Sequence, residues 1–581
     1  MNSKNRNCQF YLICLLCFLS IAWSSLYISL FQLGDNGVSV PFKILVGIMD
    51  GTIGVLPLIL FRGKWRFLEL LPVVLIPLVA LANVLFLRNY GDMIPGRMYF
   101  MSQIADPTVI EAARASFRMS DFSLLLLPVA ATSMLVIYRE SVLSFKVRRR
   151  FLSGLSVSVL MLMLVVFAGS SRRTYKWHEG FTALDAIRET VSPVKSDWQS
   201  YMALGGLCGY VARCSVDIFN KPKEMSDDET ERVKACLDRK NQDNFHGGEC
   251  CRNGNLENLI LIVVESLTSK VFDYPEKEIY MPCLSGLEKD PAALVVTKVV
   301  PQVLFGQSSD GQFMYNTGLL PLQDEALVLN YGDKDYPSLA KALGKESAEV
   351  IGESGSVWKH NVTTVSYGFG SLYDNASSTA KDKDREIFQK ALDVCDSFRK
   401  GFFLFVSTLT MHDPYTDAKV DSPAEIGPMP GFTAEDINYL RRLNYFDNEL
   451  CRFISGLKAR GLFDKSLIVI ASDHQIREEA ASPAIIGQYI PWIILNSPVG
   501  GNVLSMVRQV DLFPTILEIF GKDYLFMGYP YSGLGRSILH ADDEPSERDT
   551  VMEYEKEISR LLITRKYAPD VFRSKEPGNA Q

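Results

Sequence analysis

The chain has 581 residues and a formal net charge of −7 at pH 7. This length suggests about three folded units, and the mild acidity argues against a nucleic-acid partner, which would favour a basic face. Apolar residues dominate positions 1–170, whereas the remainder has the composition of a soluble globular chain.

The apolar part predicts an all-α transmembrane bundle. A helix needs about 20 mostly apolar residues to cross a bilayer, and five stretches approach this pattern: residues 10–33, 43–61, 65–87, 122–138 and 151–169. Buried helices of a soluble core would be the alternative, but five such runs in succession fit it poorly. The first run is longer than most signal-peptide cores, so we expect it to remain as a helix. Residues 1–170 are therefore expected to form a transmembrane domain of about five helices.

The distribution of Lys and Arg predicts the orientation of these helices. Basic residues gather before the first span, after the second and after the fourth, which predicts that these loops are cytoplasmic. They are Lys4, Arg6, Arg62, Lys64, Arg66, Arg139, Lys146, Arg148, Arg149 and Arg150. With an odd number of spans, the chain after residue 169 lies outside the cytoplasmic membrane, in the periplasm or at the cell surface. The loop 88–121 also lies outside and has arginines of its own.

Cysteine usage agrees with an oxidising compartment. Eight cysteines follow the last predicted span: Cys208, Cys214, Cys236, Cys250, Cys251, Cys283, Cys395 and Cys451. Five of them crowd residues 171–255, which we expect to be an extracytoplasmic linker in which disulfide bonds are compatible with the cysteine content. Zinc is the competing interpretation, but no paired CxxC spacing supports it. The sequence leaves the pairing open.

From residue 256 onward, short apolar runs alternate with helical stretches. Strands are expected at 258–264, 293–300, 349–352, 402–408, 466–472 and 491–495, and helices near 336–343, 384–400, 434–460 and 507–520. Apolar runs of this length separated by helices indicate an α/β domain with a mostly parallel central sheet. We place this domain at residues 256–545 and a C-terminal extension at 546–581.

Polar residues follow three of the predicted strands directly. Glu265 follows the first, His412 comes shortly after the 402–408 strand, and Asp473 and His474 follow the 466–472 strand. Taken singly, each is better explained as a solvated or hydrogen-bonded residue. Together they would meet at one edge of a parallel sheet, where ligands bind. Two carboxylates and an imidazole suit one divalent cation, with manganese as the first expectation and zinc or magnesium as alternatives.

A hydroxyl nucleophile is expected in the polar turn 306–313, which precedes an apolar helical run. A serine at a helix N-terminus lies in positive potential beside free backbone N–H groups, which favours a nearby phosphate. Metal coordination would further lower the cost of forming its alkoxide. The alternative is that Ser308 or Ser309 only caps the helix.

These motifs resemble lipoteichoic acid synthase and its relatives, which are membrane phosphoglycerol transferases of the sulfatase-like, alkaline phosphatase superfamily. The resemblance rests on 258–266, on the turn at 308–310 leading into 315–321, on 472–474, and on 509–517. It covers about residues 258–536 and implies an alkaline phosphatase/sulfatase-like fold.

The resemblance also implies roles for individual residues. The family's metal ligands fall on Glu265, Asp473 and His474, and its nucleophile, a threonine that also contacts the metal, falls on Ser308. Serine in place of threonine keeps the hydroxyl that the chemistry needs.

The family's substrate-binding histidine falls on His412 and its substrate-contacting tryptophan on Trp358. Its headgroup-binding arginine falls on His360, a departure that weakens the assignment of a glycerol phosphate headgroup. Lys359 is a possible replacement for this arginine, but its ammonium is a point charge and lacks the paired N–H donors of a guanidinium group.

The expected function is metal-dependent transfer of a phospholipid headgroup, phosphoglycerol first, through a phospho-serine to an extracytoplasmic glycan, polymer or lipid acceptor. The donor would be phosphatidylglycerol or phosphatidylethanolamine. Phosphoethanolamine transfer, hydrolysis as a phosphodiesterase, and an inactive membrane scaffold remain alternatives. A true sulfatase would need a C/S-x-P-x-R motif, and the residues after Cys283 lack it.

Overall fold

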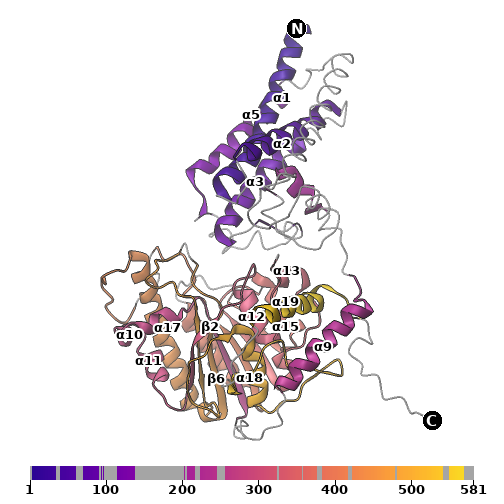
Figure 1. The fold of residues 1–581 in the computed structure, drawn as a ribbon. Helices are drawn as coiled ribbons and strands as arrows, with labels where there is room; N and C mark the ends of the chain where they lie inside the picture. Colours follow the sequence, from indigo (N-terminus) through magenta and orange to yellow (C-terminus); the bar gives the residue numbers. More distant parts are fainter. Residues whose placement is uncertain are drawn as a thin grey trace, which may run out of the picture. The chain divides into compact units, whose positions relative to one another are not determined.

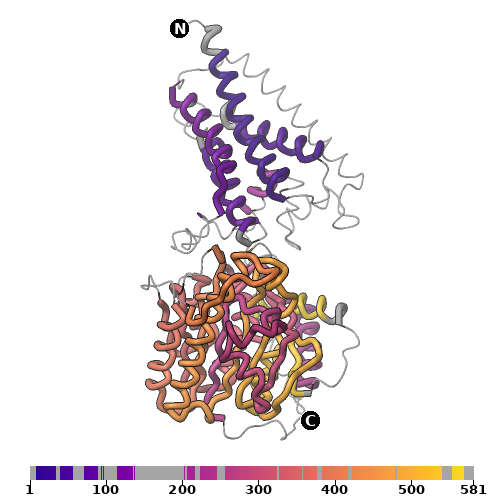
Figure 2. Tube along the Cα trace, turned by 90° about the vertical axis from the view of Figure 1, so that its left-hand side faces the viewer, coloured from indigo at the N-terminus to yellow at the C-terminus, as the bar shows by residue number. Residues whose placement is uncertain are grey.

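The chain is described by a computed structural model. The described residues are 3–33, 40–60, 70–90, 116–137, 206–212, 223–244, 256–323, 326–355, 357–375, 383–416, 422–477, 480–540 and 548–567, with a few isolated positions between them. They divide into two compact units, Met1–Lys221 and Pro222–Gln581. Figures 1 and 2 show a helical first unit and a mixed second unit.

The first unit is built from apolar helices. They are α1 (Ser3–Leu26), η1 (Tyr27–Gln32), α2 (Val40–Leu60), α3 (Leu70–Tyr90), η5 (Met119–Phe122) and α5 (Ser123–Ile137). Among the described residues, Cys8–Gln32 and Leu71–Arg88 are long and apolar enough to cross a membrane, and Met119–Met134 is a shorter apolar helix. The first four predicted spans fall on these helices. The fifth, 151–169, lies outside the described residues, so the number of spans stays a prediction.

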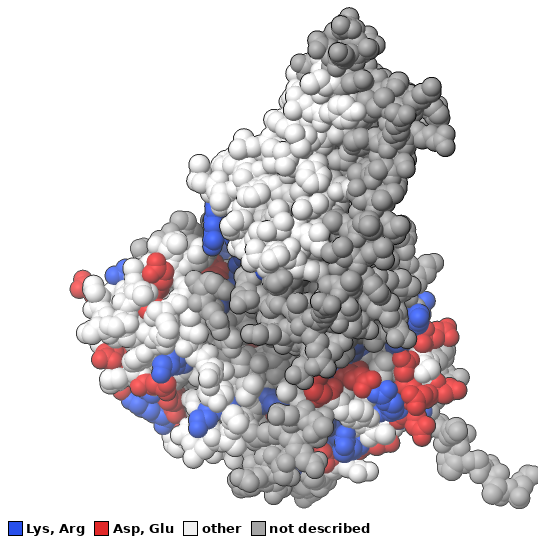
Figure 3. All heavy atoms as spheres, turned by 45° about the horizontal axis from the view of Figure 1, so that its top comes forward, with Lys and Arg blue, Asp and Glu red and all other residues white. Residues whose placement is uncertain are grey.

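Two charged side chains described in this unit, Asp50 and Arg88, have polar partners. The carboxylate of Asp50 in α2 accepts hydrogen bonds from the backbone N–H groups of Leu207, at 2.6 Å, and Cys208, at 3.0 Å. Arg88 in α3 forms an ion pair with the buried Asp121, at 2.7 Å. Such pairing removes most of the cost of placing charge among apolar helices. In the view of Figure 3, few described residues of this unit are charged, whereas the second unit shows many acidic and basic side chains.

The second unit is organised around one mixed sheet of nine strands in the order β4-β3-β5-β1-β6-β7-β2-β8, with β9 also paired to β2. Five neighbouring strands, from β4 to β6, are mutually parallel, whereas β7 is antiparallel to both of its neighbours. The strands are β1 (Asn258–Val264), β2 (Leu294–Val300), β3 (Glu346–Ile351), β4 (Ser371–Tyr373), β5 (Phe402–Ser407), β6 (Ser466–Ser472), β7 (Ile490–Leu495), β8 (Gly501–Val503) and β9 (Val507–Arg508). This confirms the predicted α/β class and the mostly parallel sheet.

Helices cover both faces of this sheet (Figure 1). One face packs against α11 (Pro282–Glu288), α16 (Lys383–Ser397) and α17 (Ala434–Ala459) in a single apolar cluster. The other face carries α12 (Ser308–Thr317), α14 (Leu339–Leu343) and α18 (Leu512–Ile519). The central strands are buried on both sides, which explains their unbroken apolar runs.

Two outer helices, α9 (Asp227–Asn244) and α19 (Arg548–Thr564), pack together against this α/β core. In α9, the Asn244 amide donates to the Ser532 hydroxyl and to the Gly535 carbonyl, at 3.1 Å each. Lys240 of α9 pairs with the buried Glu555 of α19. Part of the expected linker and part of the expected C-terminal extension therefore belong to the second unit, which begins at Pro222.

Disulfide bonds within residues 171–255 stay a prediction. Cys208, Cys214 and Cys236 of that segment, and Cys283, Cys395 and Cys451 beyond it, are unbridged in this structure. Residues 250 and 251 lie outside the described residues.

Candidate active site

The site forms where the parallel strands β1 and β6 end side by side. Their register pairs Val264 with Ser472, so the residues that follow, Glu265 and Asp473, emerge at the same edge. The backbone N–H of Ser266 donates to the Asp473 carboxylate at 2.9 Å. Ser266 has φ of 50°, a left-handed conformation that is uncommon for a residue with a side chain. The chain thus turns sharply at the point where the first carboxylate is presented.

Helix α12 brings the serine to this edge. Gln307 is the N-cap residue, with φ of 45°, and Ser308 opens the helix. The Ser308 hydroxyl donates to Glu265 Oε2 at 3.2 Å and lies 3.0 Å from His474 Nε2. Ser308 is therefore not the cap of the helix, and its hydroxyl points at the two strand ends.

Close packing holds α12 against the strand ends. A Cβ atom on Gly311 would lie 2.3 Å from the carbonyl oxygen of Asp473, so only glycine permits this approach. Asp310 is fully buried, and its Oδ2 accepts the backbone N–H groups of Leu304 and Gly306 at 2.9 Å each. Burial raises the pKa of Asp310 to about 7. These contacts fix the turn that carries the serine.

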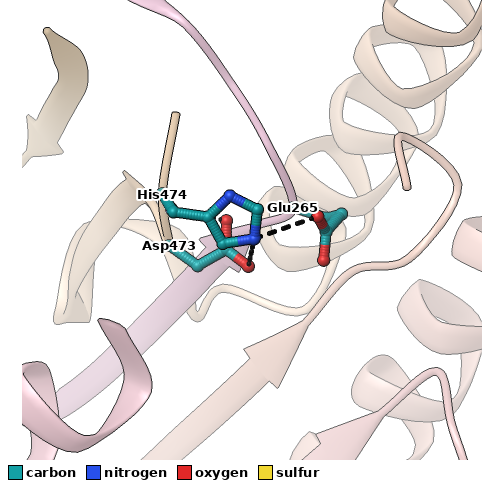
Figure 4. A group of neighbouring side chains, drawn as sticks. All are labelled: Glu265, Asp473 and His474. Carbon is teal, nitrogen blue, oxygen red and sulfur yellow. Dashed lines mark hydrogen bonds and ion pairs between the residues drawn. The ribbon is translucent and has the colours of Figure 1, made fainter. Parts of the chain in front are cut away.

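Glu265, Asp473 and His474 form a compact, buried group. One potential ligand atom from each lies within 4.8 Å of the others. Figure 4 shows one imidazole nitrogen directed at both carboxylates, and His474 Nε2 lies 3.3 Å from Glu265 and 3.5 Å from Asp473. His474 Nδ1 donates to the Gln475 carbonyl at 2.8 Å, which leaves the Nε2 lone pair free for a metal.

The electrostatics of this group favour a bound cation. Burial and the charge of Glu265 raise the pKa of Asp473 to about 7. Burial alone would lower the pKa of His474, but the carboxylates of Asp473 and Glu265 raise it above its ordinary value. Burial alone would raise the pKa of Glu265, but His474 and His412 hold it lower. Two buried carboxylates around one imidazole make an anionic group whose ligand atoms suit a hard or borderline divalent cation.

His412 lies beside this group on the loop after β5. Its Nδ1 donates to the Asp413 carbonyl at 2.6 Å, and its side chain is 43% exposed, whereas that of His474 is 3% exposed. Buried Arg442 of α17 donates hydrogen bonds to the carbonyl of His412 and to that of Pro414, the latter at 2.6 Å. These two bonds fix the loop that carries His412. His412 is thus open to a ligand in a way that His474 is not.

The remaining predicted residues follow β3, which is two strands from β1, and lie in η8 (Val357–Lys359) and at the start of α15 (His360–Ser366). Trp358 and Lys359 both have positive φ, 48° and 54°. The Lys359 ammonium donates to the Leu329 carbonyl at 2.6 Å, so it is already engaged by the protein. His360 is buried, and its Nε2 lies 3.2 Å from Glu353 Oε1. Two carboxylates, Glu353 first, then Glu349, raise the pKa of His360 against the opposing effect of burial.

The sequence did not single out the buried groups that position these residues. Besides Asp310 and Arg442, Asp384 at the start of α16 accepts the N–H groups of Leu409, at 2.8 Å, and Thr410, at 3.1 Å. Asp310 stands in the predicted serine turn, so its spacing offered a signal. Arg442 and Asp384 lie inside ordinary amphipathic helices, where a charged residue is usually solvated.

Residues 257–522 match the family described as Sulfatase. This segment is a Sulfatase-family domain. It runs from the start of β1 to just beyond α18 and contains every predicted site residue.

The chain that carries the sulfatase domain is similar to lipoteichoic acid synthases. It is 28% identical over 304 residues to lipoteichoic acid synthase 2 of Bacillus subtilis, which covers 47% of this chain and 46% of that protein. It is 27% identical over 253 residues to the lipoteichoic acid synthase of Staphylococcus saprophyticus, covering 38% and 39%. The match thus spans less than half the length of either relative. These similarities confirm the resemblance that the motifs indicated.

Among solved structures, the sulfatase domain is similar to the lipoteichoic acid synthase LtaP from Listeria monocytogenes. The TM-score is 0.42 with 16% identity, covering 56% of this chain and 96% of that one.

Proposed function

We propose that this protein is a membrane-bound, metal-dependent phosphotransferase that moves the phosphoglycerol headgroup of phosphatidylglycerol to an extracytoplasmic acceptor. The acceptor would be a glycan, a polymer or another lipid. One observation carries the proposal: the hydroxyl of Ser308, at the start of a helix, lies within 3.2 Å of both Glu265 and His474 in a buried anionic site. The sequence similarity to lipoteichoic acid synthases supports the choice of headgroup.

Two displacements at phosphorus make up the proposed reaction. Ser308 Oγ attacks the phosphorus, the bond to the diacylglycerol oxygen breaks, and that oxygen takes a proton. An acceptor hydroxyl then attacks the phospho-Ser308, the bond from phosphorus to Oγ breaks, and Ser308 regains its proton. We assign His412 to orienting the donor or acceptor, because its exposed ring lies close enough to Glu265 to lower the pKa of that carboxyl group and is held through Nδ1.

Glu265, Asp473, His474 and Ser308 would hold the divalent cation, for which manganese is our first choice. When bound, the cation would lower the pKa of the Ser308 hydroxyl and offset charge on the phosphoryl oxygens. The helical first unit would keep the site close to an insoluble lipid donor, which replaces a search in solution by a local one.

A phosphoethanolamine headgroup is the second candidate, and the loop after β3 favours it. His360 stands where the family has a headgroup-binding arginine, and its Nε2 is paired with Glu353. Lys359 cannot supply the missing charge without leaving the Leu329 carbonyl. An ammonium would pair with the Glu353 carboxylate, whereas a glycerol would only donate a hydrogen bond to it.

The test is headgroup transfer by the full-length protein in vesicles that contain either phosphatidylglycerol or phosphatidylethanolamine with a radiolabelled headgroup. We expect label to leave phosphatidylglycerol, and Ser308→Ala to abolish the release. Ser309→Ala is the matched control, because the Ser309 hydroxyl donates to the Gly306 carbonyl and not to the site. Release from phosphatidylethanolamine alone would select the second candidate. Undiminished release by Ser308→Ala would remove the serine from the reaction.

A further inference from the structure

Two cysteines from distant parts of the chain meet on the outer side of the helical layer. Cys283 lies in α11, ahead of β2, and Cys451 lies in α17, after β5. After burial, the neighbouring Cys451 thiol contributes to raising the pKa of Cys283, so the two side chains lie close together.

The backbone around this pair fixes its geometry. The N–H groups of Cys283 and Leu284 both donate to the Asp447 carboxylate, at 2.8 Å each. Asp447 and Cys451 are four residues apart in α17, so they lie on the same face one turn apart. Holding the backbone of Cys283 at Asp447 therefore keeps Cys283 within about one helical turn of Cys451. Figure 1 shows α11 lying beside α17.

We propose that Cys283 and Cys451 form a disulfide bond that ties α11 to α17 in the mature protein. Because α11 leads directly into β2, and β2 into the turn that carries Ser308, the bond would brace the crossover that delivers the serine. The predicted extracytoplasmic location of this domain provides the oxidising compartment that such bonds require.

The oxidant is a disulfide, either of a thiol oxidoreductase or of glutathione. Cys451 is exposed, so its thiolate attacks the oxidant and forms a mixed disulfide. The thiolate of Cys283 then displaces the second thiol of the oxidant. Two S–H bonds break, one S–S bond forms, and two electrons and two protons pass to the oxidant. Burial raises the pKa of Cys283, which makes it the second and not the first to react.

Other thiols provide the contrast. Cys395 is buried in α16 and Cys236 in α9, whereas Cys451 is exposed. Burial raises the pKa of Cys395 to about 12, so it is a poor nucleophile at neutral pH. We expect Cys395 to remain a thiol under conditions that oxidise the Cys283–Cys451 pair.

The direct test is peptide mapping of the full-length protein, purified in detergent without reductant, after free thiols are blocked with iodoacetamide. We expect a cross-linked peptide that contains Cys283 and Cys451 and disappears on reduction, with Cys395 alkylated. Alkylation of both cysteines, or a bond from either one to a different cysteine, would overturn the proposal. This measurement uses the unaltered protein and does not depend on whether headgroup transfer occurs.

A second measurement concerns stability. Reductant should lower the Tm of the wild-type protein by roughly 5 °C. The variant with Cys283→Ser and Cys451→Ser should show no shift with reductant, whereas the control Cys395→Ser should behave like the wild type. An equal reductant shift in the double variant would contradict the bond.

Discussion

Ser308 Oγ lies 3.0 Å from His474 Nε2, although the two residues are 166 positions apart in the chain. The Nδ1 atom of His474 is engaged by the Gln475 carbonyl, so Nε2 can accept a proton or bind a metal but cannot do both. The Oε2 atom of Glu265, which accepts the hydrogen bond of the Ser308 hydroxyl at 3.2 Å, is a second group that could take the proton of the serine.

Removal of the metal should stop headgroup transfer. A chelator should abolish activity, and Mn²⁺ should restore it. Glu265→Gln should weaken metal affinity by more than about 100-fold, because it removes a charged ligand from a buried site. Metal content and titration calorimetry of the purified full-length protein would measure this.

The matched control is Glu257→Gln, at the opposite end of β1, where the carboxylate is exposed and only pairs with Lys465. It should bind metal like the wild type. Equal metal affinities of the wild type, Glu265→Gln and Glu257→Gln would show that the metal binds at a different site.

Gly311→Ala should disrupt the junction of α12 with the strand ends. The added methyl would meet the Asp473 backbone at 2.3 Å, and a backbone atom cannot swing aside as a side chain can. We expect a loss of about 3 kcal/mol in the free energy of unfolding, at the upper end for overpacking. Denaturant unfolding and metal titration would both report it.

Gly286→Ala is the control, since a Cβ atom at that helical position meets nothing within 4 Å. It should gain up to about 1 kcal/mol through helix propensity. Similar behaviour of the two variants would refute the close approach.

We expect Asp310 to support turnover through only one of its carboxylate oxygens, Oδ2. Both N–H groups, from Leu304 and Gly306, donate to Oδ2, so the amide oxygen of Asp310→Asn can replace it. Asp310→Ala removes the acceptor and should lower kcat by about 100-fold through displacement of the serine turn, with KM little changed. Steady-state kinetics would compare the variants, and equal losses in Asn and Ala would show that the negative charge is needed.

Asp447 should make stability depend on pH. Burial raises its pKa from 3.8 to about 7 in the folded protein. Between these values the folded state keeps a proton that the unfolded state has lost, so stability falls as pH rises through this window, by at most about 1.4 kcal/mol per pH unit. Asp447→Asn should remove this contribution, and Tm measured from pH 4 to pH 8 would reveal it.

Asp396→Asn serves as the opposite case. Asp396 is exposed, and its hydrogen bond with Arg460 lowers its pKa, so its contribution to stability is present above its ordinary pKa and is lost as pH falls. A wild-type profile that Asp447→Asn leaves unchanged would contradict the assignment for Asp447.

Much of the sheet could be predicted because its central strands are buried on both faces and read as unbroken apolar runs. The order of the strands could not be predicted in this way. Strand β1 lies between β5 and β6, and this order decides which strand ends meet. The order depends on pairing between distant segments, which no local sequence pattern indicates. The edge strands β4, β8 and β9 were missed because each has only two or three residues.

The site, too, could be predicted from the sequence only in part. Glu265, Asp473 and His474 follow strands, so the sequence predicts their position, and the structure places them together. Lys359 illustrates the opposite: nothing in the sequence shows that its ammonium reaches the Leu329 carbonyl. The proximity of Cys283 and Cys451 likewise depends on the packing of α11 against α17, which the sequence does not indicate.

If Ser308 carries the headgroup between donor and acceptor, the headgroup should be found on this residue when no acceptor is present. Peptide mass spectrometry of the full-length protein, quenched after mixing with phosphatidylglycerol vesicles and Mn²⁺ in the absence of acceptor, would detect it. We expect a phosphoglycerol ester on Ser308. An ester on a different residue, or turnover with no covalent adduct at any time point, would contradict it.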